Sequence, residues 1–153
     1  MSFLLDTNII SELRKPAKRR DDRFNAWAGT LSPSETYLSV ITLLELRAGI
    51  ENKRRHDPRQ AAILDSWLDH SVLPAYTGRM LDVDQAVADS AARLHAPNRR
   101  PAHDALIAAT AQVYGLTLVT RDESDFAPMG GSLINPWTHL PGDGAAGGMP
   151  PKA

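Results

Sequence analysis

The sequence predicts an α/β protein in which a parallel sheet of four to five strands is flanked by helices on both faces. Three observations support this class. Short apolar runs alternate along the chain with longer segments of helical periodicity. The chain has 153 residues, which is the size of one domain and enough for a proper core. Two of the apolar runs are followed within two residues by an acid, and the carboxyl ends of parallel strands are where ligands bind in open α/β sheets.

The predicted elements alternate in type. Strands are expected over residues 3–5, 37–40, 80–83, 116–120 and 133–134. Helices are expected over residues 7–13, 42–52, 59–72, 84–95 and 102–114. A shorter helical piece holds Phe24 and Trp27 and ends at Gly29. Thr42 is a candidate cap for the helix over 42–52, and Pro74 is expected to stop the helix over 59–72.

The composition is that of an ordinary globular domain, because 42% of the residues are hydrophobic, 23% are charged and the formal net charge is −1. This charge gives no bulk signature of nucleic-acid binding. The lack of cysteine excludes disulfides and thiolate metal sites. With no apolar run of the ~18 residues that span a membrane and no signal-peptide pattern, we expect a cytoplasmic protein. Residues 1–140 are expected to form the domain, and residues 141–153 a disordered tail.

Acids follow two of the predicted strands. Asp6 comes directly after Phe3-Leu4-Leu5, and Asp122 lies two residues beyond Thr120. Because the carboxyl ends of parallel strands share one edge of the sheet, Asp6 and Asp122 are expected to converge there. Each also suits an ordinary helix cap, so the position alone does not separate a ligand-binding acid from a capping one.

Two further acids lie early in helices that run back from this edge. Glu45 shares a helix side with Ile41 and Ala48, and burying it unpaired would be costly, so it needs a partner. Asp104 lies in the first turn of its helix, where its charge would also complement the helix dipole. Clustered carboxylates repel unless a proton or cation separates them, and hard oxygen ligands suit Mg²⁺ or Mn²⁺. The four acids therefore indicate a site that positions a phosphate and activates water.

Four segments carry a family resemblance: residues 4–12 (LLDTNIISE), 39–46 (SVITLLEL), 103–111 (HDALIAATA) and 119–122 (VTRD). In this order they resemble the PIN-domain ribonucleases, and within them the VapC/FitB-like toxins of bacterial toxin–antitoxin pairs. Asn135-Pro136-Trp137 is similar to the same subgroup. The similarity runs from about residue 4 to residue 137.

The resemblance implies a Rossmann-like PIN-domain fold and cleavage of RNA that depends on Mg²⁺ or Mn²⁺. It also implies homodimerisation and neutralisation by a small VapB-like antitoxin. Carried over by motif, the catalytic and metal-binding residues are Asp6, Glu45, Asp104 and Asp122. Asn8 and Thr120 would orient carboxylates or water, Asp125 is an extra acid, and His103 is a surface residue or a neighbour of the site.

Rival functions are separated by the same residues. A phosphatase of the haloacid-dehalogenase pattern would use Asp6 as nucleophile and a second Asp two residues later, where Asn8 stands. A phospho-acceptor receiver domain needs an acidic pair after its first strand and a phosphorylated Asp after its third, and neither is present. The remaining alternative is a PIN-like module that binds nucleic acid or protein without catalysis. Ribonuclease activity that a chelator abolishes would exclude this alternative.

A chain with net charge −1 must concentrate positive potential locally if it is to hold RNA phosphates. The candidates are Arg14, Lys15, Lys18, Arg19, Arg20, Arg47, Arg99 and Arg100. The antitoxin is expected to lay an apolar segment into a groove and to place a basic side chain among the acids. From the helix faces, this groove is expected to be lined by Leu13, Trp27, Leu43 and Leu46.

Overall fold

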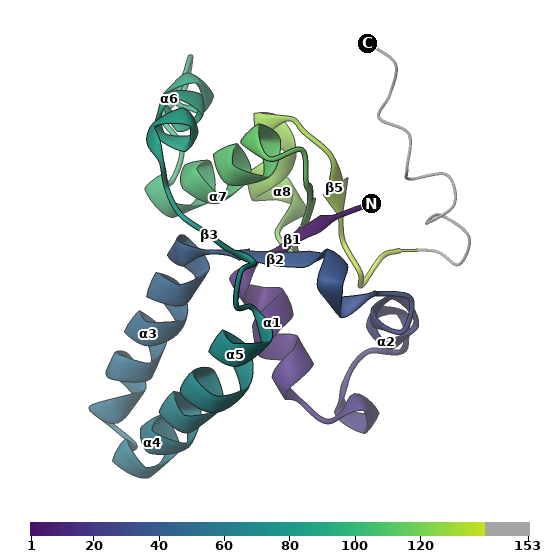
Figure 1. The fold of residues 1–153 in the computed structure, drawn as a ribbon, viewed down its shortest axis with the longest axis vertical. Coiled ribbons are helices and arrows are strands. Elements are labelled where there is room, and N and C mark those ends of the chain that lie inside the picture. The colour runs from purple at the N-terminus through teal and green to yellow at the C-terminus, as the bar shows by residue number, and fades with distance from the viewer. Residues whose placement is uncertain (140–153) are drawn as a thin grey trace.

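A five-stranded parallel sheet forms the centre of the computed structural model, which describes residues 1–139 (Figure 1). The strand order is β3-β2-β1-β4-β5. The strands are β1 (Phe3–Leu5), β2 (Thr36–Ser39), β3 (Met80–Leu81), β4 (Thr117–Val119) and β5 (Leu133–Ile134). The predicted α/β class is confirmed; β3 and β4 are shorter than expected, and β2 begins and ends one residue earlier. The tail expected over residues 141–153 lies outside the described residues.

Helices connect the strands and cover both faces of the sheet (Figure 1). The α-helices are α1 (Thr7–Arg14), α2 (Asp22–Ala28), α3 (Val40–Arg54), α4 (Pro58–Trp67), α5 (Leu73–Ala75), α6 (Gln85–Leu94), α7 (Ala102–Val113) and α8 (Glu123–Phe126). Single 3-10 turns cover Ala17–Arg19, Pro33–Glu35 and Ala127–Met129, and a π-helical turn covers Leu68–Val72. None of the helices in residues 1–139 combines the length and apolar character needed to cross a membrane.

Two local predictions are corrected by the structure. The cap of α3 is Ser39, whose Oγ accepts a hydrogen bond of 3.0 Å from the N–H of Ile41, whereas Thr42 is buried within the helix. Pro74 does not stop the helical segment over 59–72, because α4 continues through the π-helical turn into α5. Pro74 lies in α5, directly after the π-helical turn over Leu68–Val72, so the proline is accommodated inside a continuous helical segment.

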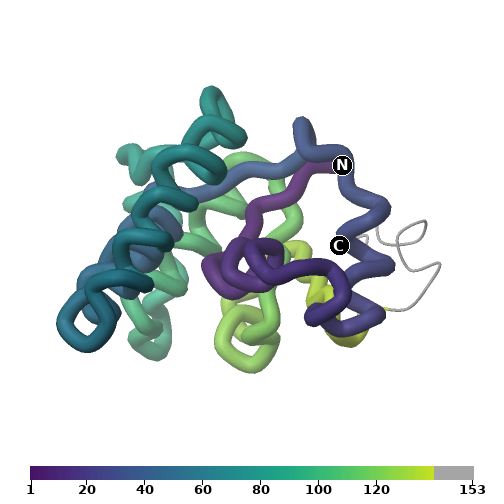
Figure 2. Tube along the Cα trace, turned by 90° about the horizontal axis from the view of Figure 1, so that it is seen from below, coloured from purple at the N-terminus to yellow at the C-terminus, as the bar shows by residue number. Residues whose placement is uncertain are grey.

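The two faces of the sheet have separate hydrophobic cores, and β1 alternates between them. Phe3 and Leu5 belong to the core beneath α1–α5, whereas Leu4 belongs to the core beneath α6–α8. Figure 2 shows α1 between α2 and the α3–α4 pair on the first of these faces. Because β1 is buried on both sides, Asp6 must emerge at the carboxyl edge of the sheet, between the two layers of helices.

Two of the four side chains expected to line an apolar groove are buried in the core. Trp27 is 3% exposed and Leu46 is 8% exposed, and both belong to the core beneath α1–α5. Leu13 and Leu43 are partly buried against the same core. The prediction is corrected for Trp27 and Leu46, which stabilise the fold, whereas Leu13 and Leu43 keep part of their surface exposed.

Candidate active site

Asp6 occupies the carboxyl end of β1 and is only 5% exposed. Its Oδ1 accepts a hydrogen bond of 2.8 Å from the N–H of Thr7, and its Oδ2 accepts one of 2.7 Å from the Thr120 hydroxyl. Asp6 therefore caps α1, as one reading of the sequence allows, but its second oxygen turns to the neighbouring strand. Burial is the main reason that the pKa of Asp6 is raised to about 6; these hydrogen bonds act to lower the pKa, and the charges of Glu45 and Asp122 contribute to raising it.

Asp122 is tied to Asp6 by neutral donors. The Nδ2 of Asn8 lies 3.4 Å from Asp6 Oδ2 and 3.2 Å from Asp122 Oδ2, so one amide donates to both carboxylates. The N–H of Asp122 donates to the Thr120 hydroxyl at 3.0 Å. Asp122 precedes α8, but its side chain makes no capping hydrogen bond. The structure thus places Asn8 and Thr120 where the sequence predicted them, between two of the acids.

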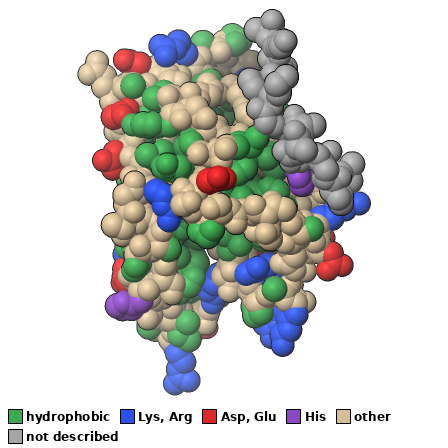
Figure 3. Space-filling model, turned by 45° about the vertical axis from the view of Figure 1, so that its right-hand side comes forward, with side chains coloured by type: hydrophobic (Ala, Val, Ile, Leu, Met, Phe, Trp, Pro, Cys, Tyr) green, Lys and Arg blue, Asp and Glu red, His purple; other side chains and the backbone are tan. Residues whose placement is uncertain are grey.

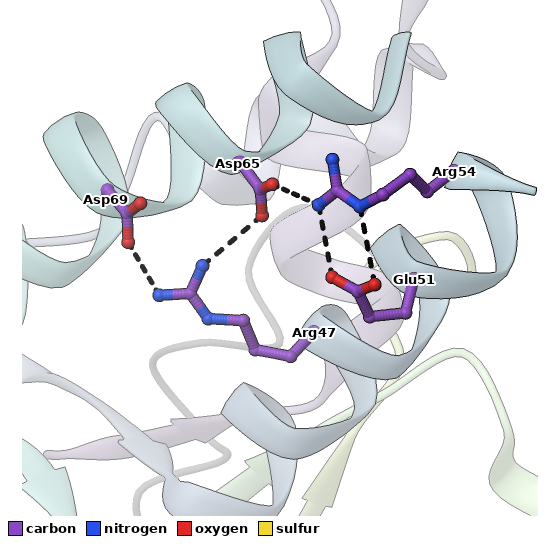
Figure 4. A network of polar contacts seen from close by, with 5 residues as sticks. All are labelled: Arg47, Glu51, Arg54, Asp65 and Asp69. Carbon is purple, nitrogen blue, oxygen red and sulfur yellow. Dashed lines mark hydrogen bonds and ion pairs between the residues drawn. The ribbon is translucent and has the colours of Figure 1, made fainter. Parts of the chain in front are cut away.

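Glu45 reaches the same region from α3. Its Oε1 accepts a hydrogen bond of 2.6 Å from the Thr7 hydroxyl, and its Oε2 lies 3.6 Å from Nδ1 of His103. The partner that its position required is therefore mainly Thr7, which the sequence reasoning missed. Arg47 points away toward Asp65 and Asp69, as Figure 4 shows.

Asp104 faces the other acids from the first turn of α7, where it makes no capping hydrogen bond. Burial is the main reason that its pKa is raised, and the charges of Asp125, Glu45 and Asp122 raise it further, whereas His103 lowers it. Asp125 is therefore close enough to influence Asp104, although Asp125 does not line the cavity described next. Among the charged groups that shift the pKa of Asp104, three are acids and His103 acts in the opposite direction.

These acids share a cavity of about 450 Å³, which we call the acidic cavity. It is lined by Asp6, Thr7, Asn8, Ser11, Glu12, Lys15, Glu45, Asp104, Arg121, Asp122 and Trp137. The sequence reasoning found all four central acids but missed Ser11, Glu12, Arg121 and Trp137 as site residues. Ser11, Glu12 and Lys15 follow Asn8 at intervals of three, four and seven residues along α1. That spacing places them on one helix face, and it was a usable signal.

Several predicted phosphate-binding cations have other roles. Arg20 donates to the carbonyl oxygens of Leu13 and Lys15, at 2.6 and 2.8 Å, and so fixes the loop after α1. Arg47 is held by two acids of the adjacent helical segment. Both predictions are corrected, because these guanidinium groups already have partners. On the face drawn in Figure 3, most Lys and Arg side chains in view lie in the lower half, on the α1–α5 side of the sheet.

The oxygen-rich acidic cavity is chemically suited to a divalent cation. Within residues 1–139, no three His, Asp or Glu side chains are grouped so that they could hold one ion by themselves. Mg²⁺ commonly binds through one or two carboxylates and keeps several of its waters, so it does not need such a cage. A cation would also relieve the repulsion that raises the pKa values of Asp6 and Asp104. The residues present therefore fit a hydrated Mg²⁺ or Mn²⁺.

Comparisons with known proteins agree with this geometry. The chain is 36% identical to Toxin FitB of Neisseria gonorrhoeae over 88% of this chain and 98% of that protein. It is 38% identical to VapC ribonuclease Y4jK of Sinorhizobium fredii over 88% and 97% of the two chains. The crystal structure of FitAcB from Neisseria gonorrhoeae superposes with a TM-score of 0.80 at 35% identity, covering 90% of this chain and 99% of that chain. A family model described as PIN domain matches residues 3–130, and the chain therefore belongs to the PIN-domain family.

Proposed function

We propose that this chain is a ribonuclease toxin that hydrolyses RNA phosphodiester bonds with Mg²⁺ or Mn²⁺ and is neutralised by a VapB-like antitoxin. The observation that carries the proposal is the meeting of Asp6, Glu45, Asp104 and Asp122, from four distant segments, around one cavity. Neutral donors hold three of these acids in place. The similarity to proteins named as a toxin and as a ribonuclease supports the same activity.

In this proposal Asp6 and Asp104 are the principal ligands of a hydrated metal ion, and Glu45 and Asp122 complete the site directly or through the water molecules of that ion. The bound ion would lower the pKa of a water molecule and offset charge on the phosphate under attack. Thr120 and Asn8 donate hydrogen bonds to the Oδ2 of Asp6, and these bonds fix the orientation of the carboxylate. Thr7 fixes one oxygen of Glu45 and leaves the other near His103. Such fixed supporting contacts preorganise the acids before substrate arrives.

The direct test is cleavage of a labelled single-stranded RNA by the purified chain. We expect cleavage with Mg²⁺ or Mn²⁺, and no cleavage when EDTA is added or when both ions are omitted. Adding back excess Mg²⁺ after EDTA should restore the activity, which separates chelation from denaturation. Full activity in EDTA would contradict a metal-dependent mechanism. Sequencing of RNA ends after induction in cells would then identify the RNA that is cut and the position of cleavage.

A binding module without catalysis is the competing function, and it predicts a different pattern. Such a module would bind RNA or protein and leave the RNA intact under every metal condition. Expression of the chain without an antitoxin should arrest growth if it is a nuclease, and co-expression of a cognate antitoxin should restore growth. Size-exclusion chromatography with light scattering would test the proposed homodimer and its complex with the antitoxin. An inert chain in the presence of metal would favour the binding module.

A further inference from the structure

Arg121 and Trp137 line the acidic cavity without contributing an acid to it. The Cζ of Arg121 lies 4.7 Å from the centroid of the Trp137 ring, so the guanidinium stacks on the indole. The Trp137 ring packs in turn against Phe24, with the ring centroids 4.9 Å apart, and Phe24 is fully buried. The guanidinium therefore rests on an aromatic surface that is anchored in the core beneath α1–α5.

The backbones of these two residues are held together by one side chain. Asn135 Nδ2 donates to the carbonyl oxygen of Arg121 at 3.4 Å, and Asn135 Oδ1 accepts from the N–H of Trp137 at 3.0 Å. On the other side, the N–H of Arg121 donates to Asn8 Oδ1 at 3.3 Å. The amide of Asn8 also contacts Asp6 and Asp122. Asn8 thus connects Arg121 to the acids, and the Asn135-Pro136-Trp137 segment holds Arg121 from the other side.

Charge balance sets Arg121 apart from the other cation of the acidic cavity. Five acids line the cavity, and Lys15 is paired with one of them, Glu12, at 2.9 Å. In the part of the chain that the structure describes, no hydrogen bond or ion pair is made by the guanidinium of Arg121. Its N–H donors are therefore available at the wall of a cavity that would otherwise repel a polyanion. Stacking leaves these donors free, because they point outward in the guanidinium plane.

We propose that Arg121, held over Trp137 by Asn135, binds the RNA phosphate next to the one that is cut. This inference rests on the proposed function, because it adds a positioning contact to the same substrate. Arginine matches a phosphate with two parallel hydrogen bonds. The residues directly before and after Arg121, Thr120 and Asp122, belong to the hydrogen-bond network that joins the acids of the cavity. A phosphate held here would place the neighbouring phosphodiester over the acids, and Arg121 would favour a substrate that continues past the cut.

The test measures RNA affinity apart from catalysis. Binding of a fluorescent single-stranded RNA oligomer would be followed by anisotropy in EDTA, over a series of salt concentrations. Arg121→Gln should weaken binding at least about tenfold, as expected for a charged hydrogen-bonded contact. It should also reduce the steepness of log K against log[salt] by about 0.7, the value for one phosphate contact to a single strand. The matched control is Arg59→Gln, which removes the same charge from an exposed position on α4 and should change neither quantity.

Two further variants separate charge from geometry. Arg121→Lys keeps the charge but loses the planar fork, so the salt dependence should remain while affinity falls several-fold. Asn135→Ala removes both hydrogen bonds of this side chain without changing the charge, so it should weaken binding less than Arg121→Gln and leave the salt dependence unchanged. Initial rates with Mg²⁺ provide a second readout, in which Arg121→Gln should raise KM more than it lowers kcat. If RNA binding in EDTA is too weak to measure, this kinetic comparison decides the matter.

The outcomes distinguish this inference from the proposed function. If the unchanged protein cleaves RNA and Arg121→Gln alters neither KM nor the salt dependence, the inference is wrong and the nuclease proposal stands. If RNA binding depends on Arg121 but no cleavage occurs, the nuclease proposal is wrong, the contact of Arg121 with RNA is established, and its assignment to the phosphate next to a cut is overturned. If Arg121→Gln weakens only the complex with the antitoxin, Arg121 serves a protein contact and the inference is overturned. A melting curve of each variant would verify that the fold is retained.

Discussion

Two groups of acidic side chains in this protein differ in what balances their charge. On α3 and the adjoining helical segment, the paired cluster joins Glu51, Asp65 and Asp69 to Arg47 and Arg54 (Figure 4). In the acidic cavity, the contacts described for the four central acids come from hydroxyl, amide and imidazole groups. Arginine thus neutralises the acids of the paired cluster. In the acidic cavity, neutral donors orient most of the central acids but do not balance their charge.

The consequence appears in the direction of the pKa shifts. The hydrogen bonds that Arg54 donates to Glu51 and Asp65 raise the pKa of Arg54, which keeps the paired cluster charged. Burial and neighbouring acids raise the pKa values of Asp6 and Asp104, so the acidic cavity resists full ionisation. Acids that brace two helices are compensated within the protein, whereas acids that are left uncompensated are typical of a binding or catalytic site. The predictions below test this contrast.

The largest expected effect is on RNA cleavage. Asp104→Asn should lower kcat/KM at least about 100-fold, because it removes a proposed metal ligand while preserving the shape of the side chain. The matched control is Asp65→Asn, which removes an acid of the paired cluster and should leave the cleavage rate within about twofold of the unchanged protein. Equal losses in the two variants would mean that the contrast between the two groups has no catalytic meaning.

The next effect is on stability without metal. Asp6 is nearly fully buried and its pKa is raised to about 6, so keeping it ionised at neutral pH costs on the order of 3 kcal/mol. Asp6→Asn removes that cost but weakens the hydrogen bonds from Thr7 and Thr120, so we expect a net rise in melting temperature of about 2–4 °C in EDTA. Mg²⁺ should stabilise the unchanged protein more than the variant. A large loss of stability in EDTA would indicate that Asp6 acts mainly as a helix cap.

The free energy of unfolding should depend on pH because Asp6 is costly to keep ionised in the folded protein. Because the pKa of Asp6 in the folded state lies above its usual value of 3.8, the folded state keeps a proton that the unfolded state releases. The stability contributed by protonated Asp6 is present below about pH 4 and is lost as pH rises to about 6 and beyond. Urea unfolding in EDTA should show Asp6→Asn becoming more stable relative to the unchanged protein across that window. A constant difference would show that Asp6 does not titrate there.

The smallest effect is expected in the paired cluster. Arg54→Gln removes an exposed guanidinium that contacts Glu51 and Asp65, and solvent screens such pairs. The melting temperature should fall by less than about 4 °C, and RNA cleavage should not change. A loss of cleavage without a loss of stability would connect the paired cluster to the site and remove the distinction between the two groups of acids.

Some errors of the sequence analysis share one cause. The apolar stripe that contains Leu46 was recognised, and so was the helical spacing of Trp27, but both side chains face the core and do not line a groove. Periodicity shows which side of a helix is apolar and not what covers it. Pro74 was expected to end a helix and instead lies in the first turn of the next one. A proline constrains its own turn, and the direction of the chain beyond it depends on packing.

The sequence by itself determined the α/β class, the five strands and the four acids, because these follow from local periodicity and from acids placed at strand and helix ends. Only the tertiary structure decided which neutral groups hold those acids. Thr7 meets Glu45 across 38 residues, and Asn8 meets Asp122 across 114. It also decided that Arg121 rests on Trp137 while Arg47 is taken by the paired cluster. Contacts of this range depend on strand order and helix packing, which no local pattern of residues encodes.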